Sequence, residues 1–206
     1  VLNPIIGRDA LPSIVVTFGL SILIQNGLLE IASADTRSIP AHGLEAASVP
    51  LGGGLAVGAL SLLIMAVALS ATTAFDWMMR FTRLGQAFRA ISDDPQTAAL
   101  MGIDARHVFG LATGLAVALL GVAGALLGMR TSVAPSDGPA QLIYAFEAVT
   151  IGGMGSFWGT FAGALILGIA QSLGSRVDAG WGALTGHFLF LAVLLMRPHG
   201  LFPKTT

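Results

Sequence analysis

The chain of 206 residues is 54% hydrophobic and only 10% charged, and its mean hydropathy is +0.82. A soluble domain carries about 25% charged residues, so this composition predicts a polytopic membrane protein of the all-α class. The net charge of −1 provides no field that would favour nucleic acid. Because the chain contains no cysteine, disulfides, thiolate catalysis and cysteine metal ligands are excluded.

Apolar segments of membrane-spanning length follow one another along the chain. The first residues, VLNPIIGRDALP, have neither the basic start nor the cleavage site of a signal peptide, and we expect that the amino-terminal part of a longer protein is missing. A spanning helix needs about 20 mostly apolar residues. Three segments meet this length, namely Leu11–Ile31, Leu51–Trp77 and Val108–Met129, and Trp181–Met196 is a shorter fourth.

The distribution of Lys and Arg orients these spans, because cytoplasmic loops are enriched in basic residues. Residues 78–107 hold four of the ten basic residues, and the tail holds Arg197 and Lys204. Residues 32–50 hold only Arg37, and residues 131–140 hold none. We therefore predict that the first end of the chain, residues 78–107 and the tail are cytoplasmic, and that the other two loops face outward.

Glycine interrupts the apolar segment Leu142–Gly174, which is too long for one span. The orientation requires three crossings here, at about Gln141–Ile151, Phe157–Gly174 and Trp181–Met196. The first is too short for a full span, so we predict a half-helix that ends at Gly152–Gly153; a re-entrant loop over residues 141–156 is the alternative. A spacing of four places three glycines on one helix face suited to close packing: Gly155, Gly159 and Gly163.

Polar side chains recur every fourth residue in the first span and so share one slowly drifting face. They are Ser13, Thr17, Ser21 and Gln25, with Asn26 beside the last. This stripe is interpreted either as a polar wall along a solute path or as a set of interhelical hydrogen-bonding groups. Glu147 is the only acid well inside an apolar segment, which by default indicates a functional group. We assign it to the path with Gly152 and Gly153; a plain hydrogen-bonding role is the alternative.

The cytoplasmic loop contains signals for two short helices. Ser92, Asp93 and Asp94 are N-cap candidates, Pro95 fits the first helical position, and Gly102 fits the residue after the helix. They predict a helix over Pro95–Met101, preceded by another over Leu84–Ile91. Such a pair indicates a docking surface. The alternative, an amphipathic loop lying on lipid headgroups, is disfavoured by the acidic residues of the loop.

No catalytic set and no metal site emerge from the sequence. The four histidines, His42, His107, His187 and His199, are scattered, and none has a carboxylate or second histidine at ligand spacing. The only lysine is Lys204, so a phosphate-binding loop with its lysine is absent. We therefore expect that the chain is not an enzyme and binds no cofactor.

Four stretches in order resemble the membrane permease of branched-chain amino-acid ABC importers, and the LivH-type subunit more than its LivM-type partner. They are TFGLSILIQN (17–26), RLGQAFRAISDDPQTAALMGID (83–104), AFEAVTIGGMGSFWGTFAGALILGIAQ (145–171) and RPHGLFPK (197–204). The resemblance implies one transmembrane permease domain over residues 1–206 that lacks its first spans. Residues 78–107 would form the coupling loop of this domain, in the bacterial inner membrane.

The resemblance also implies partners. A second permease subunit, favoured to be a different chain of LivM type, would pair with this one; two cytoplasmic ATPases that use ATP and Mg would dock beneath, and a periplasmic or lipid-anchored binding protein would deliver solute. The permease pattern Glu-Ala-Ala is met loosely, because Thr97 stands in the acidic place and the glycine arrives one position early. The residues assigned to ATPase coupling are Arg89, Asp94, Pro95, Thr97, Ala98, Ala99 and Gly102.

Three other functions compete with a branched-chain amino-acid permease. The family includes importers of urea and short amides, so the solute is open. A channel or carrier without an ATPase is disfavoured by the capped cytoplasmic helix pair. An intramembrane enzyme is disfavoured because the sequence offers no acid dyad, no cysteine and no histidine cluster.

Overall fold

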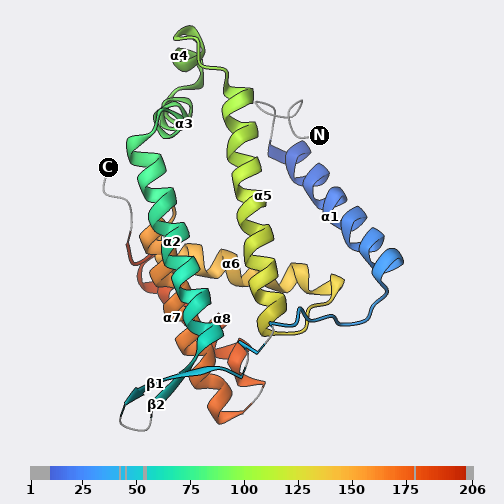
Figure 1. The fold of residues 1–206 in the computed structure, drawn as a ribbon. Coiled ribbons are helices and arrows are strands. Elements are labelled where there is room, and N and C mark those ends of the chain that lie inside the picture. The colour runs from blue at the N-terminus through green and yellow to red at the C-terminus, as the bar shows by residue number, and fades with distance from the viewer. Residues whose placement is uncertain (1–9, 42, 45, 53–54, 179, 203–206) are drawn as a thin grey trace. The chain divides into compact units, whose positions relative to one another are not determined.

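The computed structural model describes residues 10–41, 43–44, 46–52, 55–178 and 180–202, and helices dominate it (Figure 1). Within these residues, α1, α2, α5 and α7 are long and apolar enough to cross a membrane, which confirms the polytopic helical class. The elements are α1 Ala10–Ala32, β1 Ser48–Gly52, β2 Leu55–Gly58, α2 Ala59–Phe81, α3 Arg83–Asp93, α4 Pro95–Leu100, α5 Ala105–Arg130, the 3₁₀ helix η2 Pro135–Asp137, α6 Gly138–Gly152, α7 Phe157–Val177 and α8 Trp181–Met196.

A β-hairpin replaces the start of one expected span. The sequence predicted a helix over Leu51–Trp77, but β1 and β2 pair antiparallel with Ser48 opposite Gly58, and α2 begins only at Ala59. The apolar content of this stretch was misread as helical. The glycines after Leu51 lower helix propensity at the start of this stretch. The two-stranded hairpin is therefore an addition to the expected all-helical fold.

The chain divides into two compact units, Val1–Met65 with Trp77–Asp137, and Ala66–Asp76 with Gly138–Thr206. In the first unit, the segment after α1 is tied to the end of α5. Arg37 and Val133 exchange backbone hydrogen bonds of 2.9 and 2.8 Å, and the Ile39 N–H donates to the Gly128 carbonyl at 2.8 Å. These two loops were predicted to lie on one side of the membrane, the outer one, and their pairing agrees with a shared side.

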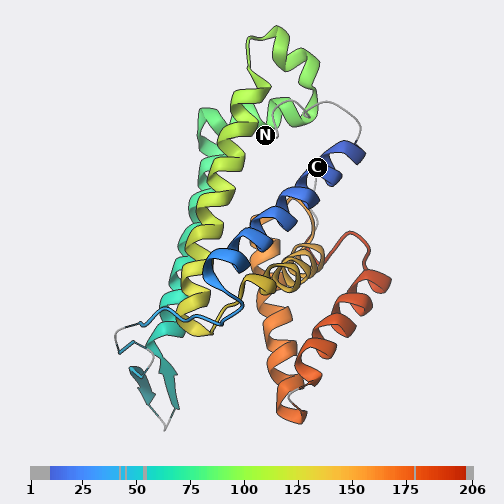
Figure 2. The ribbon, with the colours of Figure 1, turned by 90° about the vertical axis from the view of Figure 1, so that its right-hand side faces the viewer.

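In the second unit, α6 and α8 both pack against α7 around a core of Ala148, Ile151 and Leu167. Figure 2 shows α7 and α8 side by side and running in opposite directions, as their short connection requires. The half-helix predicted to end at Gly152–Gly153 is α6, which ends at Gly152.

The RPHGLF segment closes the end of α6. The last four carbonyls of a helix lack partners within it, and here the N–H groups of Leu201 and Phe202 bind the Ile151 and Gly152 carbonyls at 2.9 and 3.0 Å. A turn in which the Gly200 N–H donates to the Arg197 carbonyl at 3.0 Å brings these groups into place. This segment of the sequence is therefore a cap for a helix that lies far from it in the chain.

Candidate functional site

A tight corner joins α2 to α3. Thr82 caps α3, because its hydroxyl accepts from the Gly85 N–H at 3.3 Å and donates to the Met78 carbonyl at 2.6 Å. Gly85 is buried, and a Cβ there would lie 2.3 Å from the Met79 carbonyl oxygen. The Arg89 guanidinium also donates to the Met79 carbonyl. The last turn of α2 and the first two turns of α3 therefore form one rigid joint.

Asp94 caps α4 and is the N-cap among the three predicted candidates. Its carboxylate accepts the Thr97 hydroxyl at 2.5 Å and the Thr97 and Gln96 N–H groups at 3.2 and 2.9 Å. Pro95 occupies the first turn, where its missing N–H costs nothing. These hydrogen bonds, with the Thr97 hydroxyl first and the two N–H groups after it, stabilise the ionised carboxylate and lower the pKa of Asp94.

Gly102 ends α4 in the left-handed conformation that the sequence predicted, with φ of +80°. The Gly102 N–H donates to the Ala99 carbonyl at 3.0 Å, and the Ile103 N–H donates to the Ala98 carbonyl at 3.1 Å. This pair of hydrogen bonds is a Schellman motif. Nothing lies within 4 Å of a Cβ added at Gly102, so the backbone conformation alone requires glycine here.

A small apolar core holds α3, α4 and α5 together. Ile91, Ala98 and Val108, one from each helix, are 2%, 4% and 8% exposed. At the end of α4, by contrast, Leu100 and Met101 are 87% and 79% exposed. Figure 2 shows α3 and α4 at the turn of the chain between α2 and α5. The corner is thus a rigid frame that presents two large apolar side chains.

The residues assigned to coupling do not all face outward. Ala98 is buried in the core of the corner, so its side chain is not available to a partner. Arg89 and Thr97 make hydrogen bonds within the corner, and Ala99 is exposed. Most of the predicted set therefore builds the corner, whereas Leu100 and Met101, which sequence reasoning did not single out, form its apolar surface.

Glu147 in α6 is 3% exposed and meets His187 of α8 through its Oε1 and the imidazole Nδ1. The His187 side chain is 42% exposed, and Tyr144 stacks on it with ring centroids 6.0 Å apart at 13°. The second carboxylate oxygen of Glu147 has no hydrogen-bond partner among the described residues, and neither has the Gln171 Nε2 in α7. No role was assigned to His187 from the sequence alone. The feature that could have indicated one is that His187 lies inside a predicted span, as Glu147 does.

Glycines set the contact between α6 and α7. A Cβ at Gly159 would lie 2.6 Å from the Gly152 carbonyl oxygen, and a Cβ at Gly163 would lie 2.3 Å from that of Ala148. Helix backbones approach this closely only where small residues meet. The structure therefore places Gly159 and Gly163 in a helix–helix contact within this chain, with Gly152 as their counterpart.

Gly155 does not belong to that helix face, contrary to the prediction. It lies in the turn between α6 and α7, where φ is +104° at Gly153 and +89° at Gly155. Ser156 then caps α7 by accepting from the Gly159 N–H at 3.0 Å. Because the helix begins only at Phe157, the spacing of four from Gly155 to Gly159 does not reflect helical periodicity.

The polar stripe lies on α1 in the first unit, whereas Glu147, Gly152 and Gly153 lie in the second. Thr17 and Ser21 are exposed, Gln25 is half-buried, and the Asn26 side chain donates to the Ile22 carbonyl at 2.8 Å. The Ser13 side chain lies outside the described part of the chain. The path residues predicted from the sequence thus come from two separate units.

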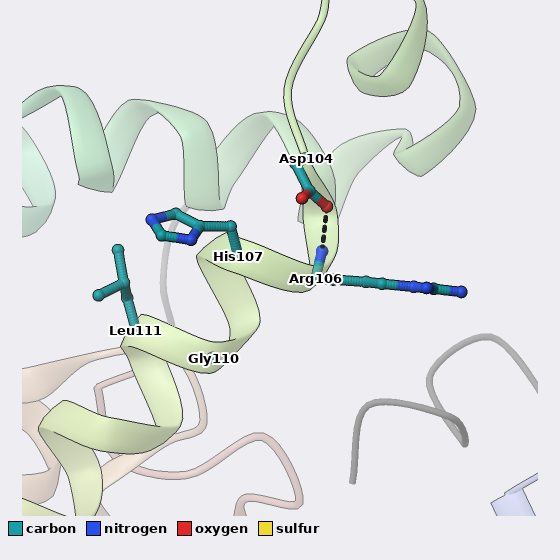
Figure 3. A pocket seen from close by; sticks show the side chains of 5 residues that line it. All are labelled: Asp104, Arg106, His107, Gly110 and Leu111. Atoms are coloured by element: carbon teal, nitrogen blue, oxygen red, sulfur yellow. Dashed lines mark hydrogen bonds between the residues drawn. The ribbon is translucent and has the colours of Figure 1, made fainter.

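An open hollow lies at the start of α5. It is lined by Asp104, Arg106, His107, Gly110 and Leu111 (Figure 3). Asp104 caps the helix by accepting from the Arg106 N–H at 2.9 Å, and Figure 3 shows the Arg106 and His107 side chains pointing away from each other. Since these polar groups do not converge, we assign no binding role to the hollow.

These features define a class: a multi-pass α-helical membrane protein with a broken, glycine-packed helical hairpin and a capped helical corner in one loop. The chain belongs to the family described as branched-chain amino acid transport system / permease component, whose model matches residues 9–196. The resemblance seen in the sequence is thereby confirmed.

Individual relatives agree with the family. The high-affinity branched-chain amino acid transport system permease protein BraD of Pseudomonas aeruginosa is 30% identical over 98% of this chain and 67% of its own. LivH of Escherichia coli K12, of the same description, is 29% identical over the same shares. The fructose import permease protein FrcC of Rhizobium meliloti is 30% identical over 93% of this chain and 56% of its own. No solved structure matches the chain significantly.

Proposed function

We propose that this chain is a membrane-spanning permease subunit of an ABC importer that carries branched-chain amino acids across the bacterial cytoplasmic membrane. ATP and Mg are used by partner ATPases that dock on the α3–α4 corner. The observation that carries this proposal is the corner itself, in which a buried core and caps at both ends hold Leu100 and Met101 exposed at 87% and 79%. Large apolar side chains fixed on a rigid frame in an aqueous loop are typical of an interface.

The corner is also connected so that a movement of α4 is transmitted to the neighbouring helices α2 and α5. At one end, the Gly85 contact and the Arg89 hydrogen bond fix α3 to the last turn of α2. At the other end, the Schellman motif at Gly102 and the Asp104 cap lead directly into α5. A push on α4 therefore reaches two candidate spans without a flexible linker, as coupling to ATP hydrolysis requires.

Relatives support the proposed solute class. BraD and LivH are named for branched-chain amino acids, whereas FrcC is named for fructose. Two of the three relatives named above thus favour branched-chain amino acids, and they cover more of this chain than FrcC does. Urea and short amides remain the alternative that the resemblance left open.

We propose that the second permease subunit is a different chain. The high-affinity branched-chain amino acid permease LivM of Escherichia coli K12 is 28% identical over 59% of this chain, so two related permease components exist side by side in that organism. A solute-binding protein outside the membrane, and two ATPase subunits, complete the proposed importer.

The docking proposal is tested with the double variant L100S/M101S in the assembled importer. Both side chains are exposed, so the spans should insert and the chain should remain monodisperse. Loss of two central apolar contacts should weaken ATPase retention about tenfold or more and abolish solute-stimulated hydrolysis. The matched control Q96A alters another exposed side chain of α4 and should retain the ATPase. Wild-type retention in the double variant would exclude the corner as the docking surface.

The solute is tested by uptake into vesicles that contain the complete importer. Leucine, isoleucine and valine should compete with one another for ATP-driven uptake, and fructose, urea and acetamide should not compete. Competition by fructose or urea instead would replace the proposed solute while leaving the permease assignment intact. Uptake that persists without ATP would favour a channel or carrier.

A further inference from the structure

The contact between Glu147 and His187 raises a question of charge that docking of the ATPases on the corner does not answer. Glu147 is 3% exposed, and one of its carboxylate oxygens has no hydrogen-bond partner among the described residues. A buried carboxylate that keeps its charge needs a compensating positive charge or a full set of hydrogen bonds. Among the residues that the structure describes, the charged or titratable group in contact with this carboxylate is the His187 imidazole.

Proton counting then restricts the state of the pair. An ionised carboxylate beside a neutral imidazole leaves one net negative charge buried between apolar helices. Adding one proton makes the pair neutral, either as carboxylate with imidazolium or as carboxylic acid with imidazole, and both forms make the hydrogen bond between Oε1 and Nδ1. We propose that Glu147 and His187 form a proton-binding site, occupied by one shared proton, that latches α8 onto α6.

The three helices that form the pair's surroundings carry few other titratable side chains. Among all residues of α6, α7 and α8, the titratable side chains are Tyr144, Glu147, Arg176 and His187. Tyr144 stacks on the imidazole face rather than donating to the carboxylate. Arg176 lies exposed in the last turn of α7. The second unit also holds Asp76 in its α2 segment, Asp178 after α7, and Arg197 and His199 in the segment after α8.

The position of the pair explains how it could exchange its proton. Glu147 is enclosed, but the His187 side chain is 42% exposed on the helix bundle, so we expect the buried carboxylate to exchange its proton through the imidazole. The proton belongs to the pair as a unit rather than to either residue. When it is lost, the buried negative charge and the unpartnered oxygen should weaken the hold of α6 on α8.

The charge state is measured in the assembled, reconstituted importer near neutral pH by solid-state NMR of ¹⁵N-histidine and ¹³C-glutamate. H187Q identifies the His187 signals by their loss. In the wild type we expect a net-neutral pair with one shared proton. In E147Q, the protonated fraction of His187 should fall, because the carboxylate that shares the proton is gone. In H187Q, Glu147 should hold the proton itself and show the carboxyl shift of a neutral acid.

A second measurement follows the latch. The thermal midpoint of the assembled importer should decrease when the pH is raised from mildly acidic to mildly alkaline. This decrease should be larger in the wild type than in E147Q or in the neutral double variant E147Q/H187Q. The controls H107Q and H199Q change histidines outside the pair and should follow the wild type. An ionised Glu147 beside a neutral His187 in the wild type, or a His187 state unaffected by E147Q, would overturn the proposal.

Discussion

Gly163 shows how one missing side chain sets the distance between two helices. A Cβ at this position would lie 2.3 Å from the Ala148 carbonyl oxygen, and the contact is backbone, which cannot rotate away. Gly168, five residues further along the same helix, has nothing within 4 Å of its Cβ position. The two glycines share a helix and differ only in what they touch.

Gly163→Ala should therefore destabilise the chain by roughly 1–3 kcal/mol, because α6 and α7 must move apart. Gly168→Ala is the matched control and should stabilise by up to about 1 kcal/mol through helix propensity. Denaturant or thermal unfolding in detergent distinguishes them. Equal stability of the two variants would mean that the close helix crossing does not exist.

The negative charge of the Asp94 carboxylate strengthens the N-cap of α4. Its pKa is lowered by the Thr97 hydroxyl first and by the Thr97 and Gln96 N–H groups after it. A carboxyl whose pKa is lower in the folded than in the unfolded state stabilises the fold above the unfolded pKa, and this contribution is lost as pH falls through the folded pKa. We expect the cap to weaken only under clearly acidic conditions.

Thr97→Val tests this assignment, since valine has the shape of threonine without the hydroxyl. The ¹³C titration of the Asp94 carboxyl should move to higher pH in this variant, and hydrogen exchange of the α4 amides in acid should speed up. The control Gln96→Ala keeps the backbone N–H that binds Asp94 and should leave the titration in place. An unchanged titration in T97V would mean that the hydroxyl does not contribute.

At the scale of elements, α4 is a short helix that depends on the caps at its two ends for its stability. Six residues are too few for helix propensity to suffice. The Asp94 cap, the Schellman motif at Gly102 and the buried side chain of Ala98 supply what length does not. The caps that stabilise α4 also hold Leu100 and Met101 outward, so a change that weakens the helix should also weaken the proposed docking surface.

Gly102→Ala should loosen α4 while leaving the spans inserted. A side chain at a φ of +80° costs on the order of 1–2 kcal/mol. Retention of the ATPase by the assembled importer should weaken, and membrane abundance should stay normal. Gly110→Ala, in the adjoining helix α5 with open space around it, is the matched control and should retain the ATPase. Normal retention in G102A would separate the geometry of α4 from docking.

At the scale of the whole molecule, the polar stripe on α1 tests where solute passes. In the cysteine-free chain, single cysteines at Thr17, Ser21 and Gln25 should react with a water-soluble thiol reagent in vesicles, and solute should alter the rate. Leu23→Cys, on the opposite face of the same helix and 72% exposed, should stay protected by lipid. Uniform protection at all three stripe positions would support helix packing instead.

Local signals in the sequence predicted much of this fold. Asp94, Pro95 and Gly102 mark α4 within nine residues, and the structure differs from the predicted helix by one residue at its end. Such caps depend on neighbours two to five positions away, which a sequence displays directly. The apolar runs likewise predicted α1, α5 and α8 closely, because burial in lipid needs only length and composition.

What the sequence did not predict depends on pairs that are distant along the chain. Glu147 and His187 are 40 residues apart, and no spacing rule links them. Leu100 and Met101 are apolar residues in a loop, and only the structure shows that Ala98 is turned inward while they are not. The hairpin of β1 and β2 was concealed by an apolar composition that suits a strand and a helix equally well.

The cap on α6 has a consequence for how the protein is made. Ile151 and Leu201 are 50 residues apart in the sequence, yet the N–H of one completes the helix end of the other. A ribosome that has released α6, α7 and α8 into the membrane has therefore not yet supplied the groups that finish α6. During synthesis the carbonyl groups at the end of α6 therefore lack these hydrogen-bond partners. We expect the second unit to complete its folding only after translation has passed residue 202.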